Sequence, residues 1–335
     1  MANTTYSITV RAYQQLLGPA SSAISVQTSS GGYCSSESID SDHGTFVWPE
    51  TDSSMRAVVA CPYGPNGVTV SRVCTSNGGW ESPNVTRCLT AISSGFKNLS
   101  KVDLTTENNI AVLMSLNELV MNSTDNDQSI DNIIIVSNIL NQTAILISGH
   151  AGLSTSNLTM ITENAIQILN SIGEWPSITR AEGNQIIQSF ERIVDAVLNH
   201  NNDTNVDVVE SNIAFAIRKF AKFNYNGFTF TTTASNGSLM IDTDGNSIDT
   251  EIGSMTIPKS ILSVTTDAKI KLAFSLYNKS AFFPIRDPPP NTIVGSSVIS
   301  ARIAGVSDGT QLPDPVVINL ALKTNNSSNP CCVST

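Results

Sequence analysis

Apolar and polar residues alternate with a period of two near the N-terminus. Tyr6, Ile8 and Val10 share one face of such a stretch, and the alternation returns at Ile24 and Val26. This pattern predicts two strands that are each buried on one side. Two strands do not form a stable domain by themselves, so we expect residues 1–28 to be part of a larger β domain.

From Leu104 to Phe223 the period is helical, because apolar residues recur at intervals of three and four. The pattern predicts five amphipathic helices. A capping box at Thr179 and Glu182 marks the start of the fourth, since the hydroxyl and the carboxylate satisfy free N–H groups there. The predicted helices cover 104–122, 129–147, 158–172, 179–197 and 209–220.

After Tyr225 the period returns to two. The alternation is clearest over 270–276 and again at Ile318, Leu320 and Leu322, with turn sequences such as Ser-Asn-Gly-Ser between the strands. We predict an antiparallel β-sandwich. Helices followed by strands indicate a multidomain α+β chain, which excludes a parallel sheet with a ligand cleft at its switch point.

Four cysteines lie between the N-terminal strands and the helices, after a flexible linker at 29–33. Cys34, Cys61, Cys74 and Cys88 are separated by 27, 13 and 14 residues, with no Cys-x-x-Cys pair and no companion histidine. This spacing favours disulfides over a zinc site. A module of this size buries little apolar surface, so covalent links must offset its chain entropy.

Composition limits the compartment and the partners. Only 14% of the 335 residues are charged and the net charge is -10, so we expect no binding to nucleic acid or to anionic lipid. The chain has eleven Asn-x-Ser/Thr acceptors for N-glycans, which favours an extracellular protein. They are Asn3, Asn84, Asn98, Asn122, Asn141, Asn157, Asn202, Asn236, Asn278, Asn325 and Asn326.

Neither a signal peptide nor a membrane anchor is expected. The first twenty residues have no continuous apolar core, and the most apolar run, Ile130 to Ile147, is interrupted by polar residues. We interpret that run as a buried helix. An extracellular chain of this kind is expected to be a piece of a longer protein or an incomplete gene model.

We expect no enzyme activity, cofactor or metal. Gly305-Val-Ser307-Asp-Gly309 fits a nucleophile elbow, but no histidine follows Ser307, and Asp308-Gly309 is more typical of a hairpin turn. The stretch from Asp242 to Glu251 has its glycine at the wrong position for a calcium loop. His43, His150 and His200 are too far apart in the sequence for a zinc site.

The cysteine module resembles the hormone-receptor domain of adhesion G protein-coupled receptors. The resemblance depends on Trp48-Pro49, Cys61-Pro62, Gly67, Cys74, Trp80 and Cys88. It implies a module over 34–88 with disulfides from Cys34 to Cys74 and from Cys61 to Cys88, and a small core of Trp48, Pro49 and Trp80. Val47 stands where secretin-type relatives often have a further cysteine.

The flanking segments are similar to other parts of the same receptors. Residues 1–28 resemble the last two strands of a fibronectin type III domain, through Tyr-x-Ile-x-Val-x-Ala and Gly-Pro-Ala-Ser. From Leu89 on, the order resembles a GAIN domain, with a helical subdomain at 89–223 and a sandwich subdomain at 224–335. Asn329-Pro-Cys331-Cys332 is similar to the start of the GPS proteolysis motif, but Thr335 stands where tryptophan is common, so self-cleavage is not carried over.

The resemblance implies the extracellular part of an adhesion G protein-coupled receptor. Its functions would be cell-surface signalling and adhesion, recognition of an extracellular protein or peptide, and presentation of a tethered agonist in the complete receptor. A G protein would be reached only through a transmembrane region outside this chain. The alternative is a soluble, truncated binding module or decoy that does not signal.

Overall fold

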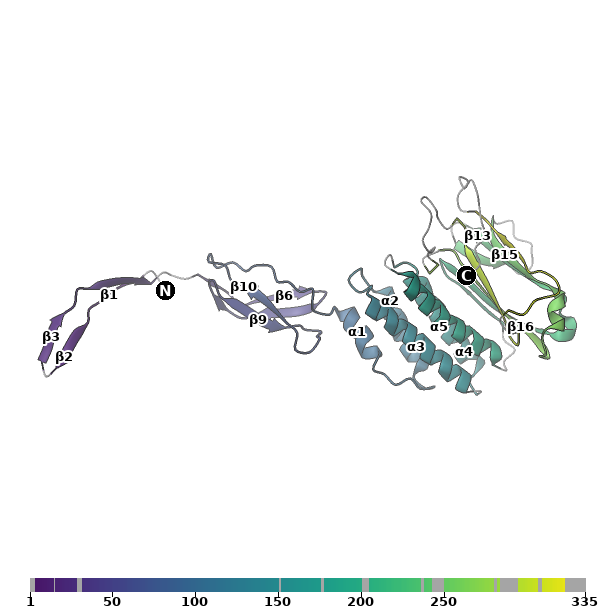
Figure 1. The fold of residues 1–335 in the computed structure, drawn as a ribbon, viewed down its shortest axis with the longest axis horizontal. Coiled ribbons are helices and arrows are strands. Elements are labelled where there is room, and N and C mark those ends of the chain that lie inside the picture. The colour runs from purple at the N-terminus through teal and green to yellow at the C-terminus, as the bar shows by residue number, and fades with distance from the viewer. Residues whose placement is uncertain are drawn as a thin grey trace. The chain divides into compact units, whose positions relative to one another are not determined.

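The structure is a computed structural model. It describes residues 4–14, 16–28, 32–150, 152–175, 178–200, 205–235, 238–242, 250–279, 282–283, 295–306 and 309–322. The chain forms two compact units, Met1–Ser94 and Gly95–Thr335. The expected α+β class is confirmed, since short β pairs come first, and a bundle of helices is followed by two β-sheets in the second unit (Figure 1).

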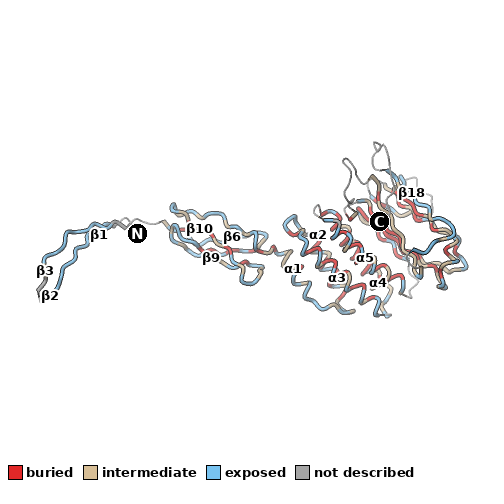
Figure 2. The backbone as a smooth tube through the Cα atoms, in the orientation of Figure 1, coloured by how far each residue is buried: buried red, intermediate tan, exposed pale blue. Residues whose placement is uncertain are grey.

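The N-terminal arm, residues 4–28, is an antiparallel ribbon. In it β1 (Thr4–Ile8) pairs with β4 (Ile24–Thr28), and β2 (Arg11–Gln14) pairs with β3 (Leu16–Ala20). The two strands form, but the prediction that one face is half-buried is wrong, because Tyr6, Ile8 and Val10 are all more than half exposed. A two-stranded ribbon has no second layer to cover its face, and Figure 2 shows exposed backbone along its length.

The stapled module, residues 33–88, contains three short antiparallel pairs. Its strands are β5 (Tyr33–Cys34) with β8 (Thr51–Asp52), β6 (Glu37–Ser41) with β7 (Gly44–Trp48), and β9 (Arg56–Ala60) with β10 (Thr69–Val73). Because β5 begins at Tyr33, the last residue of the expected linker belongs to the module. Gly44 turns the chain from β6 into β7 at φ +95°, and a Cβ there would lie 2.6 Å from Pro62, so this turn requires glycine.

Five helices occur in the described part of the chain. They are α1 (Ala91–Leu99), α2 (Asn109–Met121), α3 (Ile130–Gly149), α4 (Thr155–Ile172) and α5 (Arg180–Asn199). The pairs α3–α5 and α2–α4 pack side by side (Figure 1). The helices predicted over 129–147, 158–172 and 179–197 are confirmed, and the capping box of Thr179 and Glu182 opens α5.

Two helix predictions need correction at the start of the bundle. The helix predicted from 104 begins only at Asn109, and α1 was not predicted at all. In α1 the apolar residues Ile92, Phe96 and Leu99 recur at helical spacing, but the helix has only nine residues and lies before the range in which the helical period was predicted. The helix starts on a cap, because the Thr90 hydroxyl accepts a hydrogen bond from the Ser93 N–H at 2.9 Å.

Two four-stranded antiparallel sheets follow the helices. One has the order β11-β12-β16-β17 and the other β14-β13-β15-β18. Phe230 and Phe274 belong to different sheets and stack with ring centroids 5.1 Å apart, at the centre of the sandwich core. The alternation predicted over 270–276 is confirmed, because Ile270, Leu272, Phe274 and Leu276 are all buried in this core.

The first sheet of the sandwich contains β11 (Val206–Val209), β12 (Ile213–Ala221), β16 (Lys269–Tyr277) and β17 (Val298–Ile303). The second contains β13 (Phe228–Ser235), β14 (Ser238–Asp242), β15 (Thr250–Ile257) and β18 (Val317–Leu320). Two 3-10 turns, η1 (Lys222–Asn224) and η2 (Lys259–Ser263), lie between strands.

The helix predicted over 209–220 is wrong, because this stretch is the end of β11 and most of β12. The first six residues of β12 are all buried. Phe215 contacts Phe190 of α5, whereas Ala214 and Ala216 lie in the sandwich core. A strand covered on both faces loses its alternation, and a short apolar run then fits a helix equally well. The helical subdomain expected at 89–223 therefore ends between Asn199 and Val206.

Candidate functional site

Two disulfides cross the stapled module. Cys34 is bonded to Cys74 and Cys61 to Cys88, with Cα atoms 5.8 Å and 5.3 Å apart. This is the pairing that the resemblance implies. One link ties the first strand to the residue after β10, and the other ties the end of β9 to the end of the module. All four cysteines are at most 7% exposed, so the links are part of the core.

The aromatic centre of the module lies beside these links. Trp48 is fully buried and packs with Phe46 and Trp80, each with its ring centroid 6.1 Å away. The indole N–H of Trp80 donates to the carbonyl of Ser35 at 3.0 Å, which holds the segment after Cys34 against the core. Trp48 and Trp80 therefore lie together, as the resemblance implies.

Pro49, the third residue expected in this core, is exposed. It follows buried Trp48 by one position, and successive residues of an extended chain point to opposite sides. Its carbonyl accepts a hydrogen bond from the Thr51 hydroxyl at 2.9 Å. Having no N–H, Pro49 ends the pairing of β7 instead of filling the core.

Arg72 also belongs to this core and was not predicted from the sequence. It is 8% exposed, and its guanidinium carbon lies 5.7 Å and 5.1 Å from the ring centroids of Trp48 and Trp80. Arg72 also donates to the carboxylate of Glu37 at 2.6 Å and to the carbonyl of Glu81 at 2.5 Å. A desolvated cation in contact with both indoles stabilises the module in addition to the disulfides.

The alternation of residues along β10 could have identified Arg72 from the sequence. Val70 and Cys74 point inward, and Arg72 lies between them on the same face of the strand. A charged residue at an inward position needs a charge or aromatic partner, and both tryptophans were already assigned to the core. The composition of the strand alone did not show which partner this would be.

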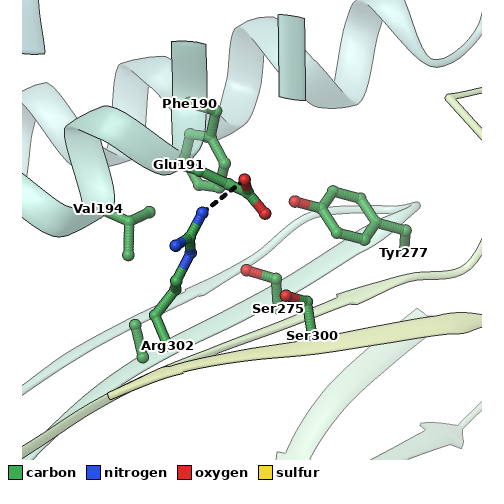
Figure 3. Close-up of a pocket in the computed structure, with 8 residues that line it drawn as sticks. Phe190, Glu191, Val194, Ser275, Tyr277, Ser300 and Arg302 are labelled. Atoms are coloured by element: carbon green, nitrogen blue, oxygen red, sulfur yellow. Dashed lines mark hydrogen bonds and ion pairs between the residues drawn. The ribbon is translucent and has the colours of Figure 1, made fainter. Parts of the chain in front are cut away.

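A second polar cluster lies between α5 and the first sheet of the sandwich. Arg302 of β17 donates to the Glu191 carboxylate at 2.6 Å, and Tyr277, Ser275 and Ser300 point into the same space (Figure 3). Burial raises the pKa of Tyr277. The enclosed cavity is about 10 Å³, which is room for one water at most. This cluster joins a helix to a sheet and is too small to bind a substrate.

The C-terminal end of the sandwich is where the GPS motif was expected. The last described strand, β18, is at the edge of its sheet, and Ile318 and Leu322 are about half exposed. Within the described residues, β18 pairs only with β15, so its other edge is open. Cys331, Cys332 and Thr335 lie outside the described residues.

Six of the expected glycan acceptors are described. Asn84, Asn98 and Asn122 are exposed, whereas Asn141, Asn157 and Asn278 are partly buried. At Asn84 the sequon already forms a turn, because the N–H and the hydroxyl of Thr86 both donate to the Asn84 side-chain oxygen, at 3.1 Å and 2.7 Å. Asn3, Asn202, Asn236, Asn325 and Asn326 lie outside the described residues.

The other chemical motifs assemble no site within the described part of the chain. No group of three or more His, Cys, Asp or Glu side chains that could hold a metal occurs there. His150 and His200 do come close, since a ring nitrogen of His200 lies 3.3 Å from the His150 carbonyl. Ser307 and most of the stretch 242–251 lie outside the described residues.

The helix α3 is long and apolar enough to cross a membrane by length and composition. Half of it is buried, and Ile133, Val136 and Leu140 are at most 1% exposed. The packing of α3 against α5 accounts for this burial. Its apolar residues therefore have a partner inside the bundle, as expected for the run from Ile130 to Ile147.

Comparisons with known proteins agree with this architecture. Residues 220–334 match the family model GPS: GAIN subdomain B. The structure of the full extracellular region of zebrafish Gpr126/Adgrg6 has a similar fold, with a TM-score of 0.54 and 16% identity over 94% of this chain and 40% of that one. The chain thus spans less than half of that extracellular region. No curated protein matches the chain.

Proposed function

We propose that this chain is part of the extracellular region of an adhesion G protein-coupled receptor. The observation that carries the proposal is the match of residues 220–334 to GAIN subdomain B, in a sandwich that follows a helical bundle. The stapled module with its two disulfides precedes that bundle, in the order expected from the sequence. The function is cell-surface signalling and adhesion, with no enzyme activity and no cofactor.

The stapled module is a hormone-receptor domain in this proposal and recognises an extracellular protein or peptide. Disulfides and the Arg72–tryptophan stack keep its short strands rigid, which lowers the entropy cost of binding. Exposed apolar side chains supply contact area on its surface. These are Tyr33, Val47, Met55, Val58 and Tyr63, each at least 43% exposed.

The helices and the sandwich present the activating strand in the complete receptor. Among the described residues no strand lies beside the outer edge of β18, and a further strand of the same protein would add to the sheet there. Signalling to a G protein would proceed through a transmembrane region outside this chain. Nucleic acid is not a partner, in line with the net charge of -10.

The N-terminal arm is the end of a fibronectin type III domain in this proposal. Its apolar residues Tyr6, Ile8, Val10, Ile24 and Val26 are exposed in the structure. In a complete fibronectin sandwich, these side chains would pack against the opposite sheet. The arm would then be stable only as part of the longer protein.

The proposal is tested by locating the natural protein in its own cells. An antibody to residues 34–88 should label intact cells, and surface biotinylation should recover a product whose transcript encodes seven apolar spans after Thr335. A stop codon soon after Thr335, with secreted product, would favour the soluble decoy. Label found only in permeabilised cells, on protein with free cysteines, would refute both.

A further inference from the structure

A groove of about 460 Å³ runs between α2 and α4. Its volume lies in the range of about 300–1,000 Å³ that is usual for ligand sites. Residues of α2 and its C-cap line one wall at intervals of three and four, and residues of α4 line the other. The side chain of Asn117 donates to Gln167 at 2.9 Å and joins the two helices.

The groove combines exposed thioethers with acidic side chains. Met114, Met121 and Met160 are 54%, 66% and 37% exposed, although large apolar side chains are usually covered. Glu118 and Glu163 are also among its lining residues, and no lysine or arginine is. Sugars suit such a surface, since their C–H faces pack on apolar atoms and their hydroxyls donate to carboxylates.

Asn122 lines the same groove and is the C-cap of α2. It is exposed, and with Thr124 it forms one of the glycan acceptors. Its side-chain nitrogen donates to the carbonyl of Glu118 at 2.8 Å, so the side chain folds back along the last turn of α2 toward the groove. N-glycosylation replaces one of the two hydrogens on this nitrogen, so the glycan begins at the end of α2, beside the groove.

We infer that the N-glycan of Asn122 lies in the groove and covers Met114, Met121 and Met160. The inference rests on the proposed extracellular location, since only chains that enter the secretory pathway receive this modification. Covalent attachment makes the contact intramolecular, so weak packing on methionines suffices to keep the sugar in place. A helix from another protein would have to displace this tethered group, which makes the glycan the favoured occupant.

Methionine oxidation measures whether the groove is covered. The complete chain, secreted from glycosylating cells, and its Asn122→Gln variant would be treated with dilute hydrogen peroxide, and each methionine followed by mass spectrometry. Oxidation of Met114, Met121 and Met160 should be about threefold slower or more in the glycosylated chain, because oxidation follows exposure. Met55 and Met240 are 60% and 47% exposed outside the groove and should oxidise equally in both.

Two controls separate the glycan from the substitution. Asn98→Gln removes another exposed acceptor and should leave groove oxidation unchanged. Endoglycosidase trimming of Asn122 to a single sugar on the native chain should speed oxidation of the groove methionines without any mutation. Equal oxidation with and without the glycan, or an unmodified Asn122 in a chain glycosylated at Asn84 or Asn98, would overturn the inference alone. A chain with no glycan at any acceptor would overturn the proposed location as well.

Discussion

The stapled module and the β-sandwich are both built from antiparallel strands, but different interactions stabilise them. The module's core cluster has six buried residues, two of them cysteines, whereas the sandwich has twelve, including Phe230 and Phe274. A small β structure cannot bury enough apolar surface, so covalent links and a cation–π stack supplement its core. The sandwich is large enough for its phenylalanines to stabilise it without disulfides among the described residues.

Removing the disulfides should unfold the module and leave the helices and the sandwich folded. Closure of the 40-residue and 27-residue separations is worth about 4 and 3.5 kcal/mol in the chain-entropy model, so loss of both should unfold residues 34–88. In a Trp175→Phe background, which removes the tryptophan buried outside the module, reductant should abolish the near-UV dichroism of Trp48 and Trp80 while the helical signal at 222 nm persists. Retention of this tryptophan signal would show that the aromatic core holds without the links.

Phe274→Ala should destabilise the sandwich and leave the module folded. The ring is fully buried between the two sheets and stacks on Phe230, so its loss should lower the free energy of unfolding of residues 95–335 by about 3–5 kcal/mol. Denaturant titration followed at 222 nm measures this, while the near-UV tryptophan signal of the module should be unchanged. The control is Phe223→Ala, since Phe223 is 87% exposed, and a comparable loss there would contradict the role of the core.

Arg72→Met tests how much of the module depends on the cation beside the tryptophans. The substitution keeps the apolar stem but removes the guanidinium with its contacts to both indoles and to Glu37, and it should destabilise the module by about 2 kcal/mol. Chemical denaturation monitored by tryptophan fluorescence gives the value under oxidising conditions, in a Trp175→Phe background because Trp175 is buried outside the module. Arg56→Met on the exposed face of β9 is the matched control and should have little effect. Equal effects of the two substitutions would mean that the stack contributes nothing of its own.

The smallest expected difference appears at high pH, in the sandwich. Burial raises the pKa of Tyr225 from 10.0 to about 12, and its hydroxyl donates to the Ile257 carbonyl at 3.0 Å. Because the folded state favours the protonated phenol, this contribution is complete below pH 10 and is lost as the pH rises toward 12. The midpoint temperature of thermal unfolding of residues 95–335 should fall over this range. It should fall less steeply in Tyr225→Phe.

A matched variant tests the assignment of this pH effect. Tyr63→Phe in the module replaces a tyrosine that is 43% exposed and should leave the pH dependence unchanged. An unaltered slope in Tyr225→Phe would assign the effect to another buried group, such as Tyr277, whose pKa burial also raises.

The sequence predicted elements well where one face alone carries large apolar residues. In β16 the residues Ile270, Leu272, Phe274 and Leu276 alternate with small or polar ones, so the period is readable although Ala273 and Ser275 are buried too. In α4 a single apolar stripe faces the bundle, and both elements formed as expected. The prediction was wrong at β12, where Phe215 and Ala216 are covered from opposite sides. A period cannot be read where both faces carry apolar residues, and only the packing of α5 on the sheet removes that ambiguity.

Cysteine spacing and the paired tryptophans predicted the module's chemistry, and sequons marked Asn122 as an acceptor. These signals are local, because each depends on residue type and on neighbours along the chain. The place of Arg72 against Trp48 and Trp80, and of Asn122 beside a groove formed with α4, involves residues far apart in sequence. The sequence by itself therefore determined three of the helices, the alternation of β16 and the use of cysteines for disulfides. Tertiary structure alone decided the identity of β12 and which side chains meet, because contact depends on three-dimensional packing that no local pattern records.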